Sequence, residues 1–148
     1  MKKLIIFTGI QASGKTSFYK ERFSDYVHVN LDELHTRNKE KKLIEECFKE
    51  GKSLVIDNTN PTIEDRQRYI GPAKENGYEI IGYYFESKIG DCIKRNSQRQ
   101  GKARIPDKAI AATYSKLQVP DFCEGFDELY YVMIINDEYV IEEWKDEI

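Results

Sequence analysis

Residues 9–16 read GIQASGKT and match the pattern GxxxxGK[ST] at every fixed position. A continuous apolar run at residues 4–8 precedes this segment, and residues 14–23 have the periodicity of a helix. In such a strand–loop–helix unit, the glycines let backbone N–H groups surround a phosphate, and the helix N-terminus adds a partial positive charge. The segment therefore predicts a binding site for the phosphates of a nucleotide.

The residues of this phosphate-binding loop (P-loop) have separate expected roles. Lys15 is expected to reach the β- and γ-phosphates, and the Thr16 hydroxyl is expected to bind Mg²⁺. The loop residues expected to contact the nucleotide are Gly9, Gln11, Ala12, Ser13, Gly14, Lys15, Thr16 and Ser17.

Short apolar runs alternate with longer helical segments along the whole chain. Strands are predicted at residues 4–8, 26–30, 53–57, 79–85 and 128–135. Helices are predicted at residues 14–23, 32–50, 61–76, 88–100 and 106–117, with Asn60 as the cap of the third. Regular alternation of this kind produces a parallel sheet with helices on both faces. The sequence thus predicts an α/β fold with five parallel strands, in a single domain over residues 1–148.

The composition excludes several classes of protein. The 148 residues include 23 Lys and Arg against 26 Asp and Glu, and this net charge of −3 argues against a cationic nucleic-acid coat and a polybasic membrane anchor. No apolar stretch approaches the roughly 18 residues that a membrane span needs. The three cysteines have no CxxC spacing, which argues against a disulfide framework or a zinc site and favours a cytoplasmic location. The acidic C-terminal segment 137–147 is predicted to be a solvated face.

Two acidic residues follow the ends of predicted strands. Asp57 ends an apolar strand and is a candidate ligand of Mg²⁺, although an Asp at this place can also simply start a turn. Asp32 follows the strand at residues 26–30, and it either caps the next helix or accepts the proton of an attacking hydroxyl. Because ligands of open α/β sheets bind at the carboxyl edge of the strands, both residues are candidates for the functional site.

A basic segment interrupts the otherwise acidic chain. Five cations fall within eleven residues: Lys94, Arg95, Arg99, Lys102 and Arg104. Arg95 and Arg99 are four residues apart, so they share one face of the predicted helix. The segment is either a solvated helix face or a lid, around residues 94–105, whose arginines neutralise the charge of a triphosphate during phosphoryl transfer.

Taken together, these segments resemble the kinase domain of 5′-polynucleotide kinases, of both the phage type and the metazoan repair type. Residues 26–30 (YVHVN), followed by Asp32, are similar to the family segment that carries the base for the 5′-hydroxyl. Residues 56–61 (IDNTNP) are similar to a family signature. Residues 66–69 (RQRY) lie where metazoan members have an Arg-x-Arg-Tyr run, and residues 94–99 (KRNSQR) resemble the phage lid.

The resemblance implies the P-loop kinase fold and a role for several residues. Asp32 would be the general base, Arg66 would touch a substrate phosphate, and Arg95 and Arg99 would be the lid residues that touch ATP. Helical phase agrees for Arg66, because it places this residue on the inward stripe of its helix. The catalytic candidates are Lys15, Asp32, Arg95 and Arg99. The substrate-binding candidates are Asp32, Arg37, Asn58, Asn60 and Arg66.

Two departures from the family pattern concern the acceptor side. Leu31 stands where the family usually has a basic residue, and His35 stands where phage members have an Arg, with Arg37 two residues further on. The resemblance implies phosphorylation, dependent on ATP and Mg²⁺, of the 5′-hydroxyl of a DNA or RNA end. A short nucleic-acid segment is the expected partner, and no obligate protein partner is expected. The alternatives are a small-molecule P-loop kinase, zeta-toxin-like or acting on nucleosides, and a nucleotide-binding regulator without turnover.

Overall fold

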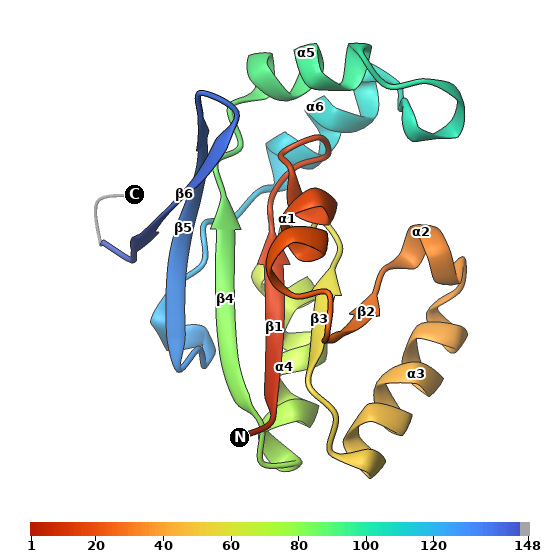
Figure 1. Ribbon diagram of the computed structural model, residues 1–148, viewed down its shortest axis with the longest axis vertical. Coiled ribbons are helices and arrows are strands. Elements are labelled where there is room, and N and C mark those ends of the chain that lie inside the picture. The colour runs from red at the N-terminus through yellow and green to blue at the C-terminus, as the bar shows by residue number, and fades with distance from the viewer. Residues whose placement is uncertain (146–148) are drawn as a thin grey trace.

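The computed structural model describes residues 1–145, which form one six-stranded sheet (Figure 1). The strands lie in the order β2-β3-β1-β4-β5-β6, and β6 alone runs antiparallel to its neighbour. They are β1 (Lys3–Thr8), β2 (Val27–Val29), β3 (Leu54–Asp57), β4 (Glu79–Phe85), β5 (Glu128–Ile135) and β6 (Glu138–Glu143). The predicted α/β fold with five parallel strands is confirmed, and the structure adds β6 as a sixth strand.

The added strand β6 forms where a solvated acidic segment was predicted. Asn136 and Asp137 have positive φ angles of 52° and 62°, as a two-residue hairpin turn between β5 and β6 requires. Glu138, Glu142 and Glu143 are exposed on this strand, so the prediction that they are solvated is confirmed. Asp146 and Glu147, at the end of the same predicted segment, lie outside the described residues.

Six α-helices and two 3₁₀ turns connect the strands within residues 1–145. They are α1 (Lys15–Arg22), α2 (Leu31–Leu34), α3 (Arg37–Glu50), α4 (Ile63–Glu75), α5 (Ile89–Ser97), η1 (Gly101–Ala103), α6 (Asp107–Lys116) and η2 (Phe122–Glu124). None of these helices is long and apolar enough to cross a membrane.

The helix predicted at residues 32–50 is divided into α2 and α3. His35 ends α2 in the left-handed region, with φ 69°, and the Thr36 hydroxyl accepts a hydrogen bond from the N–H of Lys39 to start α3. The cap of α2 is Asn30, whose side chain accepts from the N–H of Glu33. Asp32 therefore is not the cap of its helix, and its carboxylate is left for another role.

The prediction that Asn60 caps the helix after β3 is wrong. Thr62 caps α4, and it forms a reciprocal capping box with Asp65. Asn60 instead has a φ of 43° and is only 4% exposed. Its side-chain amide donates to the carbonyl oxygen of Phe7 at 2.8 Å, so it ties the loop after β3 to the end of β1.

Alternate residues of the parallel strands pack against different helices. Leu4 and Ile6 of β1 belong to the core cluster that includes residues of α3 and α4, whereas Ile5 and Phe7 pack with Phe18 of α1. The sheet is thus covered on both faces, as continuous apolar strands require. The helices on the two faces leave the carboxyl ends of β1, β2 and β3 together at one edge of the sheet. The P-loop follows β1 at this edge and α2 follows β2 (Figure 1).

Candidate active site

Two glycines let the P-loop turn tightly between β1 and α1. Gly14 has a φ of 96°, and a Cβ there would lie 2.9 Å from Ile134 and 3.2 Å from the hydroxyl of Tyr139. A Cβ on Gly9 would lie 2.8 Å from the Ser13 hydroxyl. Side chains at either position would clash or strain the backbone, which explains why the motif has glycine at both.

Lys15 lies folded over the P-loop. Its ammonium donates to the carbonyl oxygen of Ile10 at 2.8 Å and lies 3.3 Å from the Ser13 hydroxyl. Burial lowers the pKa of Lys15 to about 8, and the nearby carboxylates of Asp57 and Asp32 oppose this shift. A buried cation with two neutral partners is a strong attractor for an anion, so the loop is prepared for a phosphate.

The two predicted metal ligands lie together. The Thr16 hydroxyl donates to Oδ2 of Asp57 at 2.8 Å, across the gap between α1 and the end of β3. Mg²⁺ is usually held by one or two hard oxygen ligands of the protein together with waters and substrate phosphates. A hydroxyl and a carboxylate beside a P-loop fit that requirement.

His28 contacts the same carboxylate and was not among the predicted site residues. Its Nε2 lies 2.7 Å from Oδ2 of Asp57, and because an ionised carboxylate only accepts, this nitrogen donates. The ring stacks on Tyr19 at 3.9 Å, and Nδ1 lies 3.2 Å from the carboxylate of Glu33. These contacts fix the ring, so His28 orients the Asp57 carboxylate. The sequence predicted that His28 lies in a strand beside the P-loop, but it did not predict the contact with Asp57.

Asp32 is exposed in the first turn of α2, at the same edge of the sheet. The N–H of the preceding residue, Leu31, donates to the side-chain oxygen of Asn58 at 3.0 Å. The amide of Asn30 donates to the carbonyl oxygen of Asp57 at 2.8 Å. Two hydrogen bonds thus attach the start of α2 to the end of β3, and they hold Asp32 close to the P-loop.

Arg37 and Asn58 belong to a polar cluster beside Asp32. Arg37 donates to Glu40 at 3.0 Å and to the hydroxyl of Tyr69 at 2.8 Å, and half of its side chain is exposed. Asn58 donates to the other carboxylate oxygen of Glu40 at 3.1 Å. Since Asn58 also accepts from the backbone of α2, both of its side-chain groups brace the site, whereas Arg37 can still face a ligand.

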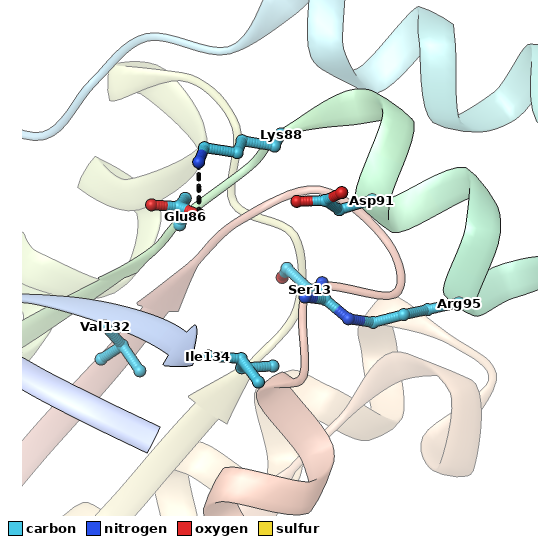
Figure 2. Close-up of a pocket in the computed structure, with 7 residues that line it drawn as sticks. All are labelled: Ser13, Glu86, Lys88, Asp91, Arg95, Val132 and Ile134. Atoms are coloured by element: carbon cyan, nitrogen blue, oxygen red, sulfur yellow. Dashed lines mark ion pairs between the residues drawn. The ribbon is translucent and has the colours of Figure 1, made fainter. Parts of the chain in front are cut away.

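The two arginines predicted to belong to a lid lie in α5 and in the turn that follows it. Figure 2 shows Arg95 reaching from α5 toward Ser13, above Ile134 of β5, and its guanidinium lies 3.4 Å from the carbonyl oxygen of Ala12. Arg99 is exposed beyond α5, and its charge contributes to the lowered pKa of Lys15. Arg95 therefore contacts the P-loop, whereas Arg99 donates to the carbonyl oxygen of Ala103 in its own turn at 3.3 Å.

A buried asparagine fixes the two ends of the segment that was predicted to be a lid. Asn96 donates to the carbonyl oxygen of Ile105 at 2.6 Å and accepts from the N–H of the same residue at 3.0 Å. The exposed residues 97–104 between these two points project as one loop. Gln11 of the P-loop donates to Thr113 of α6 at 2.8 Å, which connects the P-loop to the helix that follows the lid.

Arg66 does not face the site, contrary to the prediction. It lies on the inward side of α4 as the helical phase indicated, but it is 0% exposed. Its Nε and Nη2 donate to the two carboxylate oxygens of Glu124 at 2.7 and 3.0 Å, and its Nη1 donates to the carbonyl oxygen of Asn60 at 3.0 Å. With all these donors engaged in the interior, neither Arg66 nor the buried Asn60 can hold a substrate phosphate in this structure.

Tyr139 of β6 is a further contact that sequence reasoning missed. Its hydroxyl donates to the carbonyl oxygen of Gly14 at 2.7 Å, and its ring lies edge-on to Phe18 at 5.0 Å. The β5–β6 hairpin thereby stabilises the P-loop through a contact with a residue that is distant in the sequence. The only local signal was the Asn136–Asp137 pair, whose residue types favour a hairpin turn.

Comparison with known proteins agrees with this geometry. The chain is 30% identical, over 97% of its length, to a putative bifunctional polynucleotide phosphatase/kinase of Acanthamoeba polyphaga mimivirus. It is 32% identical, over 84% of its length, to a bifunctional polynucleotide phosphatase/kinase of Schizosaccharomyces pombe. The chain spans 37% and 32%, respectively, of the lengths of these relatives. The motif resemblance to polynucleotide kinases is therefore confirmed.

The fold also matches solved structures. Kti12 of Chaetomium thermophilum, in complex with ADP-AlF3, superposes with a TM-score of 0.63 and 16% identity, over 91% of each chain. The family model of the AAA domain (AAA_33) matches residues 4–120, from β1 through the P-loop, Asp57 and α5 to the loop after α6. Because this match includes the P-loop and most of the chain, the protein belongs to the AAA_33 family of P-loop domains.

Proposed function

We propose that this protein transfers the γ-phosphoryl group of ATP to the 5′-hydroxyl of a DNA or RNA end. The observation that carries the proposal is the placement of Asp32. It is an exposed carboxylate that does not cap its helix, and hydrogen bonds from the preceding residues Asn30 and Leu31 attach its segment to the end of β3, at the edge that carries the P-loop. A kinase needs such a group to accept the proton of the attacking hydroxyl. The names of the viral and yeast relatives support a polynucleotide acceptor.

The donor side follows from the P-loop geometry. Lys15 exchanges its neutral partners for the β- and γ-phosphates, and the backbone N–H groups of the loop surround them. Thr16 and Asp57 would hold Mg²⁺, which would supply positive charge against the charge that develops during transfer. Arg95 and Arg99 add further positive charge from the lid.

The acceptor side rests on few residues. Asp32 accepts the proton of the 5′-hydroxyl. Arg37 is paired with Glu40 in the adjacent polar cluster, but half of its side chain is exposed, so its guanidinium can also contact a phosphate of the acceptor. Because Arg66 is buried and Leu31 is apolar, the acceptor footprint is short. The protein is proposed to work in the cytoplasm, where its unpaired cysteines Cys47, Cys92 and Cys123 stay reduced.

A small-molecule kinase is the second candidate, and the same shortage of cations at the acceptor edge favours it. One panel separates the two: labelled ATP offered to 5′-hydroxyl DNA, 5′-hydroxyl RNA, nucleosides and sugar nucleotides, with Asp32→Asn as the matched control. The proposal expects a labelled 5′-phosphate on an oligonucleotide with the wild type and loss of that label with the control. Transfer only to a sugar nucleotide or a nucleoside would refute the proposed polynucleotide kinase activity. No transfer to any acceptor would also refute it and would favour a nucleotide-binding regulator without turnover.

A further inference from the structure

A groove with a volume of about 470 Å³ lies between α3 and α4, below the polar cluster of Arg37 and Glu40. This volume is within the range of about 300–1,000 Å³ typical of sites that hold small organic ligands. Apolar and aromatic side chains form its walls, contributed by Ile44 and Phe48 of α3 and by Tyr69 and Pro72 of α4. None of the roles proposed above uses these four residues as ligand contacts.

Hydrogen bonds link the groove to the acceptor side of the active site. Glu40, in its wall, accepts a hydrogen bond from Asn58 at 3.1 Å, and Asn58 accepts one from the N–H of Leu31 at 3.0 Å. Leu31 immediately precedes Asp32. Two successive hydrogen bonds therefore connect the groove wall to the residue next to the proposed base, so the groove lies beside the acceptor side of the site.

Cations line the groove although the protein as a whole is acidic. Lys41 of α3 and Arg68 of α4 both line the groove, and neither forms an ion pair within residues 1–145. The described lining includes two acidic residues, Glu45 and the buried Glu40, and Glu40 is paired with Arg37. The groove thus presents unpaired positive charge beside apolar walls.

Single-stranded nucleic acid is recognised by this combination, because bases stack on apolar and aromatic side chains while cations follow the phosphates. We propose that the groove between α3 and α4 binds the second and third nucleotides of a single-stranded acceptor, with bases against Ile44 and Phe48 and phosphates at Lys41 and Arg68. This inference rests on the proposed function, and it extends that function from the reacting hydroxyl to the strand behind it.

The test compares two double charge reversals on the same surface. Lys41→Glu/Arg68→Glu removes the groove cations, whereas Lys42→Glu/Lys49→Glu makes an equal charge change at exposed residues of α3 that do not line the groove. KM and kcat are measured with 5′-hydroxyl acceptors from a nucleoside 3′-monophosphate to a hexanucleotide. Binding of a fluorescent 5′-hydroxyl hexanucleotide is measured separately by anisotropy, over a range of salt concentrations.

In the wild type, KM is expected to fall as the acceptor grows to about three nucleotides and then to stay level. The groove variant should lose this length preference, with about tenfold weaker hexanucleotide binding. Its salt slope should be shallower by about 1.4, because each single-strand phosphate contact contributes about 0.7. The control variant should keep both the preference and the slope, because α3 residues outside the groove do not touch the strand.

Three results would overturn the inference. They are a wild-type KM that does not depend on acceptor length, an unchanged salt slope in the groove variant, and equal effects of the two double variants. Failure of the proposed function has a different signature, which is a wild type that phosphorylates no 5′-hydroxyl acceptor of any length. In that case the anisotropy measurement still shows whether the groove binds a single strand, because binding requires no phosphoryl transfer.

Discussion

Glu124→Gln is expected to destabilise the protein strongly, although Glu124 lies in a short 3₁₀ turn far from the P-loop in the sequence. Glu124 accepts hydrogen bonds from two nitrogens of the fully buried Arg66 and from the N–H of Asp121. Gln keeps the shape and one acceptor oxygen, but it removes the negative charge. The guanidinium of Arg66 would then be a buried cation whose remaining partners are neutral.

The size of the effect follows from this burial. Removing one member of a buried ion pair costs about 3–5 kcal/mol, and the retained amide oxygen places Glu124→Gln near the lower end, at about 3 kcal/mol. In a chain of this size, each kcal/mol lowers the melting temperature by about 2–4 °C, which gives a decrease of about 6–12 °C. This is a large part of the ~5–15 kcal/mol that stabilises a typical domain.

Thermal and urea unfolding followed by circular dichroism provide the assay. Glu46→Gln, at an exposed position of α3, is the matched control and should lie within about 0.5 kcal/mol of the wild type. Arg66→Met/Glu124→Gln removes the unpaired cation and should be more stable than Glu124→Gln alone. Its KM for an oligonucleotide should stay at the wild-type value, because Arg66 does not reach the acceptor. A Glu124→Gln loss below 1 kcal/mol, or a raised acceptor KM in the double variant, would refute this reasoning.

Substitutions at three further residues test the active site. Asp32→Asn should lower kcat by about 10²- to 10⁴-fold with ATP affinity nearly unchanged; collapse of ATP binding in a fluorescent-nucleotide titration would instead make Asp32 a structural residue. His28→Ala should weaken Mg²⁺ affinity about 10- to 100-fold by releasing the Asp57 carboxylate, whereas His28→Gln, which keeps a donor, should lose less; Mg²⁺-dependent nucleotide binding measures both, and equal losses would contradict the orienting role. Tyr139→Phe removes one hydrogen bond to Gly14 and should cost about 1 kcal/mol in stability, together with weaker ATP binding; unchanged calorimetric ATP affinity would show that the hairpin does not support the P-loop.

Local sequence patterns were sufficient to predict the five parallel strands and to place the P-loop and Asp57 at the carboxyl ends of two of them. These features are defined by the spacing of residues along one element or across one turn, which can be read directly from a sequence. They are the GIQASGKT segment, the apolar run before it and the Asp at the end of β3. The same holds for Arg66, whose inward position followed correctly from helical phase. Helical phase could not predict that Arg66 pairs with Glu124, because Glu124 lies 58 residues away along the chain. This pairing places Arg66 in the protein core and not at the substrate site.

The remaining contacts are long-range and involve residue types with many possible roles. Tyr139 reaches Gly14 across 125 residues, and no periodicity connects them. His28 contacts Asp57 because β2 and β3 are neighbours in register, which depends on the strand order of the sheet. Asn60 resembled a helix cap in sequence, but its positive φ and its bond to β1 move the start of α4 two residues further along the chain.

The two edges of the sheet also bear on how the protein behaves at high concentration. An unprotected edge strand offers free backbone groups to the edge of another molecule and so invites ordered aggregation. Here one edge is β2, which has only three residues, and the other is β6, which carries the exposed carboxylates of Glu138, Glu142 and Glu143. Like charges at that edge repel a second copy brought alongside. The acidic hairpin therefore protects the apolar strand β5 from intermolecular pairing, and neutralising its three glutamates should make the folded protein prone to self-association.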